Sequence, residues 1–130
     1  MIGYIVLGTN DLDRALGFYD TLLAQIGGKR LMTMPDGRGF TLYGAGRDKP
    51  MLAVTRPYDG AAASAGNGTM VALAAADRAQ VDALYATAIG AGAADEGAPG
   101  ERGVDPAGRA FYGAYFRDPD GNKVCAYKVG

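Results

Sequence analysis

Residues 4–19 read YIVLGTNDLDRALGFY, and the pattern of this stretch occurs twice in the chain. A short apolar strand around Tyr4 leads into a helix that we expect to end at Gly28. About 65 residues later, a strand around Met70 leads into a second helix, which we expect to end at Gly92. An internal repeat constrains architecture more strongly than local propensity does, so the sequence predicts two similar modules.

Each predicted helix has signals for its start and for its buried face. Asn10 is a good N-cap for the first helix, and Asp13 favours the positive end of the helix dipole. Asp77 caps the second helix, and Gln80 completes a pair that is typical of a capping box. Apolar residues recur with helical spacing at Leu12, Leu16, Tyr19, Leu23 and Ile26 in the first helix, and at Val81, Leu84 and Ala88 in the second.

The remaining segments predict strands and turns. The strands are expected at 2–8, 29–34, 39–44, 50–56, 68–74, 110–117 and 122–129. The sequence from Asp118 to Asn122 is a strong turn signal between the last two strands. The stretch 90–108 is rich in Gly, Ala and Pro and predicts a long mobile loop, which hides or shortens one strand of the second module.

This order predicts an α+β fold in which two βαβββ modules pair into a cup-shaped mixed sheet, with the helices outside. The chain of 130 residues is expected to form a single domain. Module one covers about 1–56, the linker covers 57–67, and module two covers about 68–130.

Composition excludes several classes of protein. The 13 Lys and Arg residues are scattered and the net charge is -1, so no basic stripe for nucleic acid is present. No apolar run is long enough to span a bilayer, which argues against a membrane protein. The single Cys125 and the lack of a signal-peptide pattern predict a cytoplasmic location. The chain has no histidine, which removes the commonest metal ligand and general base.

Four motifs carry a resemblance to a known family. They are Asn10-Asp11-Leu12-Asp13-Arg14-Ala15 with Phe18-Tyr19, Gly66-Asn67-Gly68-Thr69, Tyr112-Gly113-Ala114-Tyr115, and Asp118-Pro119-Asp120-Gly121-Asn122. Together with the order of elements, they resemble the vicinal oxygen chelate superfamily. This superfamily includes glyoxalase I, extradiol dioxygenases, fosfomycin-resistance proteins and bleomycin-resistance proteins. The resemblance covers nearly the whole chain.

The resemblance implies a metal site, but this chain departs from its ligand pattern. Catalytic members hold a divalent metal with a His on the first strand, a His on the strand that opens the second module, and a Glu on the last strand. The matching residues here are Tyr4, Met70 and Cys125. Hard divalent cations prefer carboxylate, imidazole or water ligands, so we predict no metal and no cofactor. The three side chains could suit a soft ion such as Cu(I), or could simply fill the vacated space.

Six residues are therefore candidates for contact with a ligand in the cup: Tyr4, Met70, Cys125, Arg56, Tyr115 and Tyr127. Arg56 could pair with an anion at the rim, although a surface arginine is the simpler interpretation. Tyr115 is favoured over Tyr112 because period two across the turn places it near Cys125. Lys123 lies on the same strand face as Cys125 and is a weak arrangement for activating a thiolate nucleophile.

Three functions fit these observations. The first is a metal-free protein that binds a small aromatic or amphipathic molecule in the cup, as a homodimer like the family members that bind bleomycin. The second is a metal-dependent lyase or dioxygenase of the same superfamily, which requires metal ligands other than those matched above. The third is a non-catalytic dimeric interaction protein with a collapsed cup. The sequence favours a protein without catalytic activity and leaves the identity of the ligand open.

Overall fold

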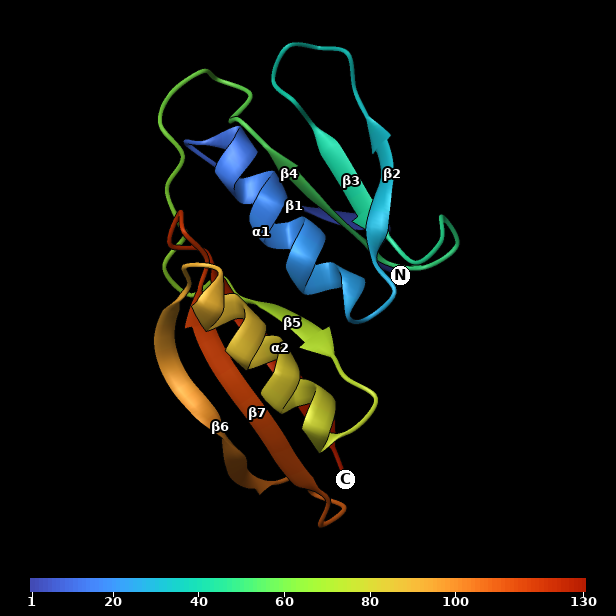
Figure 1. Cartoon of the computed structure of the whole chain (residues 1–130). Coiled ribbons are helices and arrows are strands. Elements are labelled where there is room, and N and C mark those ends of the chain that lie inside the picture. Colours follow the sequence, from blue (N-terminus) through green and yellow to red (C-terminus); the bar gives the residue numbers. More distant parts are fainter.

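The repeat in the sequence corresponds to two modules of the same design in the computed structural model, which describes residues 1–130 (Figure 1). The first module contains β1 (Tyr4–Gly8), α1 (Leu12–Ala24), β2 (Lys29–Thr33), β3 (Thr41–Gly44) and β4 (Met51–Thr55). The second contains β5 (Val71–Ala74), α2 (Arg78–Gly90), β6 (Ala94–Val104), β7 (Ala110–Arg117) and β8 (Lys123–Val129). This order confirms the predicted α+β fold built from two βαβββ modules.

Each module forms its own mixed sheet with the same strand order. The orders are β1-β4-β3-β2 and β5-β8-β7-β6. The pairs β1–β4 and β5–β8 are parallel, and the other neighbours are antiparallel. The parallel pairing follows from the crossover through a helix, because parallel neighbours need a long connection. The edge strands are β1 and β2 in the first sheet, and β5 and β6 in the second.

The two helices join the modules. Each helix packs on one face of its own sheet, and α1 also contacts α2 (Figure 1). Sixteen buried residues from both modules form one apolar cluster, in which Leu22 and Leu84 are fully buried. Burial of such a side chain contributes roughly 1.5–3 kcal/mol to stability. Neither helix is long and apolar enough to cross a membrane.

The buried face of α1 is rotated slightly from the predicted one. Tyr19 and Leu23 are buried as predicted, but Phe18 and Leu22 share the core with them. Leu16 is only partly buried and lies at the margin of the cluster. The helix lies under a sheet on one side and against α2 on another, so its apolar face is wider than a single stripe.

The predicted N-cap of α1 is wrong by one residue. Asp11 is the cap, and its side chain accepts a hydrogen bond of 3.1 Å from the Arg14 N–H. The side chain of Asn10 instead exchanges two hydrogen bonds with the backbone of Ala63, at 3.1 and 2.6 Å. Asn10 therefore fastens the linker to the start of α1. Either residue type can cap a helix, so the sequence alone did not distinguish them.

The cap of α2 is confirmed at Asp77, whose side chain accepts from the Gln80 N–H at 2.8 Å. The Gln80 Oε1 accepts from the N–H of Ala76, one residue before the expected partner, at 2.7 Å. Its Nε2 donates to the carbonyl of Gln25 at the end of α1, at 2.9 Å. One side chain thus completes a helix start and links the two helices.

The prediction of a mobile loop over 90–108 is wrong, because Ala94–Val104 form β6. This strand lies at the edge of its sheet and pairs only with β7. Pro99 is tolerated there because an edge strand does not need every N–H. The register shifts three times, and such bulges accommodate the extra residues of a glycine-rich segment. The composition of this segment therefore predicted a loop, although pairing with β7 stabilises it as a strand.

The predicted turn between β7 and β8 is confirmed and joins the modules. The Tyr19 hydroxyl donates to the buried Asp118 carboxylate at 2.6 Å, and Asn122 donates to it through its N–H and its side-chain amide, both at 2.9 Å. Asp120 accepts from the Arg14 guanidinium at 3.0 Å. Burial, followed by the negative charge of Asp118, raises the pKa of Tyr19 well above its ordinary value. Module two thus fixes the start of α1.

Candidate functional site

The sheet faces that no helix covers expose large apolar side chains. On β1, Tyr4 is 54% exposed and Val6 is 49% exposed, and Met70, directly before β5, is 43% exposed. Their neighbours Leu7 and Val71 point the other way, toward the helices and the apolar cluster. We refer to the uncovered sides as open face A, on the β1–β4 sheet, and open face B, on the β5–β8 sheet.

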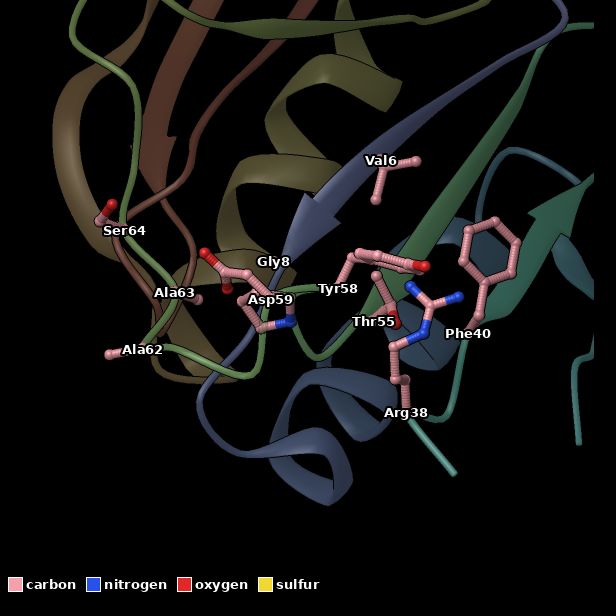
Figure 2. Close-up of a pocket in the computed structure, with 11 residues that line it drawn as sticks. Val6, Gly8, Arg38, Phe40, Thr55, Tyr58, Asp59, Ala62, Ala63 and Ser64 are labelled. Carbon is pink, nitrogen blue, oxygen red and sulfur yellow. The ribbon is translucent and has the colours of Figure 1, made fainter. Parts of the chain in front are cut away.

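Open face A contains an aromatic pair and a cavity. The rings of Tyr4 and Phe40 meet edge to face, with centroids 6.0 Å apart. A cavity of about 500 Å³ lies at the end of β1, lined among others by Val6, Phe40, Thr55 and Tyr58 (Figure 2). Its residues come from β1, β4, the segment before β3 and the linker between the modules.

Arg38 also lines this cavity. Its guanidinium carbon lies 5.0 Å from the centroid of the Tyr58 ring, a cation–π distance (Figure 2). The guanidinium also pairs with the Asp36 carboxylate at 2.6 Å. Asp36 therefore already neutralises much of the charge of Arg38.

Arg56 lies beside this cavity and forms hydrogen bonds to the loop between β2 and β3. Its Nη1 donates to the carbonyls of Gly37 and Arg38, at 3.3 and 3.5 Å. These contacts hold the loop between β2 and β3 against the end of β4. Arg56 also borders a smaller hollow of about 320 Å³. Contact of Arg56 with an anionic ligand stays a prediction.

Open face B also carries aromatic side chains. Tyr115 on β7 lies directly opposite Cys125 on β8, the pairing that the period across the turn predicted. Tyr127 shares this face, and its ring stacks on Phe111 with centroids 5.4 Å apart and planes 3° from parallel. Tyr112 belongs to the other face, where its hydroxyl contacts α2. The opposite parity of Tyr112 and Tyr115 thus places Tyr112 on the side of α2 and Tyr115 on open face B.

Cys125 lies on open face B, but its side chain is fully buried. Burial raises the pKa of the Cys125 thiol, and this outweighs the opposing influence of Tyr115, Arg102 and Lys123. A buried, protonated thiol is a poor nucleophile. Cys125 therefore contributes packing to this face, and Lys123 does not activate it as a thiolate.

Two cations on open face B complete the surroundings of Tyr115. The Arg102 guanidinium lies 5.7 Å from the centroid of the Tyr115 ring, and the Lys123 ammonium lies 5.6 Å from it. Sequence analysis placed Arg102 in a loop and so missed it. The sequence 97–104, GAPGERGV, carries no alternating pattern that would have indicated this strand.

The residues at the positions of the family's metal ligands do not fit a divalent metal. Tyr4 lies on β1 of one sheet, whereas Cys125 lies on β8 of the other and Met70 lies directly before β5, and the two sheets share no strand. A thioether and a protonated thiol are weak ligands for hard cations. No group of three or more His, Cys, Asp or Glu side chains in the chain could hold a metal ion.

The comparisons with known proteins agree on one family. The model of the Glyoxalase/Bleomycin resistance protein/Dioxygenase superfamily matches residues 1–126. A glyoxalase/bleomycin resistance protein from Albidiferax ferrireducens T118 is 35% identical, with a TM-score of 0.82 and 98% of both chains covered. No curated protein matches the sequence.

Two further solved structures are similar in fold. A glyoxalase/bleomycin resistance protein/dioxygenase family enzyme from Burkholderia phytofirmans PsJN is 19% identical, with a TM-score of 0.76 and 98% of both chains covered. A lactoylglutathione lyase from Agrobacterium tumefaciens is 26% identical, with a TM-score of 0.63, and 98% of this chain and 92% of that one are covered. The similarity thus extends over the full length of both modules.

Proposed function

Because this chain belongs to the Glyoxalase/Bleomycin resistance protein/Dioxygenase superfamily, we propose that it binds a small aromatic or amphipathic molecule between its open sheet faces, without a metal. The observation that carries this proposal is the exposure of Tyr4, Val6 and Met70 on faces that no helix covers. Grouped exposed apolar side chains on a soluble protein mark interaction or ligand surfaces. The aromatic rings of both faces supply flat contact area for such a molecule.

A second copy of the chain completes the binding site in this proposal. Within one chain the modules meet through α1, α2 and the turn between β7 and β8, and no strand of one sheet pairs with a strand of the other. Open face A of one copy against open face B of another would bring Tyr4 opposite Met70 and Tyr115. β1 and β5 are edge strands of their sheets, and pairing of such an edge with another chain would support the same association.

The absence of metal in this proposal follows from the donor chemistry described above. The lactoylglutathione lyase among the similar structures is an enzyme by its name, but its low identity supports only the shared fold. Cys125 offers no hard donor, and Tyr4 offers a phenol on the other sheet. The chain keeps the fold of the family but carries Tyr4, Met70 and Cys125 at the positions of the metal ligands. This combination favours ligand binding over metal-dependent catalysis. A cytoplasmic location stays a prediction from the sequence.

The dimer is tested by sedimentation equilibrium on the wild-type chain and two variants. Val6→Glu introduces a charge on open face A, and we expect it to weaken dimerisation at least about tenfold, because a buried unpaired carboxylate is costly. Val104→Glu places the same charge on β6, where Val104 is already 70% exposed, and should leave the dimer unchanged. A monomeric wild-type chain would contradict the shared site.

Ligand binding is tested by a thermal-shift screen of small aromatic and amphipathic compounds. A ligand that prefers the native state raises the melting temperature. We expect compounds that stabilise the wild-type chain to lose their effect in Val6→Glu and to keep it in Val104→Glu. If no compound in a broad screen stabilises the protein, the binding function is wrong.

The metal-free part is tested by elemental mass spectrometry of the tag-free protein, before and after incubation with divalent ions. We expect near-zero occupancy after dialysis. About one Fe, Ni, Zn or Mn per chain that survives dialysis would contradict this part, and would favour the lyase or dioxygenase alternative.

A further inference from the structure

Open face B carries more positive than negative charge. Its charged side chains are Arg102, Arg117, Lys123 and Glu96. The Arg117 guanidinium and the Glu96 carboxylate form an ion pair with an N–O distance of 2.7 Å. Neither Arg102 nor Lys123 forms an ion pair with a carboxylate in the chain. Glu96 is the one carboxylate on this face, and its pKa is lowered first by Arg117 and also by the charge of Lys123, so the face as a whole stays positive.

The position of Arg102 is fixed by the backbone of β6. Its Nη2 donates to the carbonyl of Ala98 at 2.5 Å. A Cβ atom on Gly97 would lie 3.2 Å from Nη2, and one on Gly100 would lie 2.9 Å from Nη1. The guanidinium thus occupies space that only glycines leave free. Since it is already held in place, little conformational entropy is lost when it binds a ligand.

Arg102 and Lys123 flank one aromatic ring. Both lie within 6 Å of the Tyr115 centroid, and Tyr115 lies beside Cys125 in the sheet. Tyr127 lies on the same face, and its ring stacks on that of Phe111. Open face B thus carries two cations close to Tyr115 and a stacked pair of aromatic rings on the same strands.

We propose that this surface binds a small aromatic carboxylate, with the carboxylate held by Arg102 and Lys123 and the ring lying on the surface of Tyr115 and Tyr127. This inference rests on the proposed function, because it assigns the chemical class of the ligand on the open faces. The planar fork of a guanidinium matches the two oxygens of a carboxylate. The low net charge of the chain and the confinement of the two cations to one face favour a small anion over a polyanion.

The experiment compares 2-naphthoate with its neutral isostere 2-naphthamide by isothermal titration calorimetry on the full chain. We expect the wild-type protein to bind 2-naphthoate about tenfold more tightly, because only the carboxylate forms charge-assisted hydrogen bonds. We expect Arg102→Gln and Lys123→Met each to reduce this preference to about twofold or less, while the affinity for 2-naphthamide changes little.

Two variants serve as matched controls. Arg47→Gln and Lys49→Met remove the same charges from the exposed turn between β3 and β4, and both should keep the preference for 2-naphthoate. A salt titration provides a second measurement, in which the preference should shrink as ionic strength rises.

The possible outcomes separate the two proposals. Equal affinity of the wild-type chain for both compounds would overturn the carboxylate inference and leave the binding function standing. Loss of both compounds in Arg102→Gln with the fold intact would show that Arg102 supports the surface without recognising charge, which also overturns the inference. No binding of either compound, together with a negative thermal-shift screen, would overturn both proposals.

Discussion

The two faces of each sheet differ in how far their side chains are buried and in whether their polar groups have partners. On the side of the helices, apolar side chains are buried, and the polar groups among them find partners within the chain, as Tyr19 and Asp118 do. On the open side, Tyr4 and Met70 are exposed, and Lys123 has no carboxylate partner. This contrast underlies the proposal that the covered face maintains the fold and that the open face binds another molecule.

The sharpest test of this contrast is truncation of one side chain from each face. Leu84→Ala removes a fully buried side chain from the apolar cluster, and we expect a loss of about 2–5 kcal/mol in unfolding free energy. Met70→Ala on open face B should cost about 0.5 kcal/mol or less, because its side chain is already exposed. Urea unfolding at a concentration where the chain is monomeric measures both. Equal losses of unfolding free energy in the two variants would contradict this distinction between the faces.

The junction between the modules should be the next most sensitive region. Asp118→Ala leaves the Tyr19 hydroxyl and the Asn122 donors buried without an acceptor, and we expect a loss of about 3 kcal/mol. Asp95→Ala is the control, because Asp95 also accepts from a tyrosine, Tyr85, but at an exposed site. A loss in Asp118→Ala no larger than in the control would show that the junction contributes little to stability.

Cys125 tests whether an open face can still protect a side chain. Its thiol is fully buried and its pKa is raised by burial. We expect the native protein to react with Ellman's reagent at least about a hundredfold more slowly than the urea-unfolded chain, because reaction requires local opening. A native rate close to the unfolded rate would mean that the thiol is accessible on open face B and would reopen the possibility of a nucleophile.

Alkaline pH should reveal the smallest of these effects. The pKa of Tyr19 is raised by burial and by the charge of Asp118, so the folded chain keeps a proton that the unfolded chain releases above about pH 10. The contribution of this group is therefore complete below that pH and falls above it, by at most about 1.4 kcal/mol per pH unit. Stability curves for the wild type and Tyr19→Phe measure this slope. Equal slopes above pH 10 would contradict the assignment.

The fold was predictable because its signals are local and occur twice. Asp77 is the N-cap of α2 as predicted, and the turn that starts at Asp118 forms as predicted. The repeat of a strand followed by a helix indicated two modules with the same order of elements. The strand β6 was not predictable, because its glycines and Pro99 disfavour a strand and only pairing with β7 stabilises it. The N-cap was ambiguous between Asn10 and Asp11 because both side chains can accept the same hydrogen bond.

The candidate site was predictable in part for the same reason. Period two placed Tyr115 opposite Cys125, since register within a hairpin follows from its turn. The positions of Arg38 and Arg102 depend on loops and bulges, for which sequence spacing carries no geometric information. The separation of Tyr4 from Met70 depends on how the modules pack through their helices, which is a property of the whole chain.

The central claim, that the open faces form a site for a small aromatic molecule, is tested most directly by a two-dimensional amide NMR titration with 2-naphthoate. We expect the largest shift changes at amides of the open-face strands, including those of Val6, Tyr115 and Cys125. Amides around Leu22 and Leu84 in the helices should change little. Changes confined to the helices, or no saturable change at any amide together with a negative thermal-shift screen, would contradict this claim.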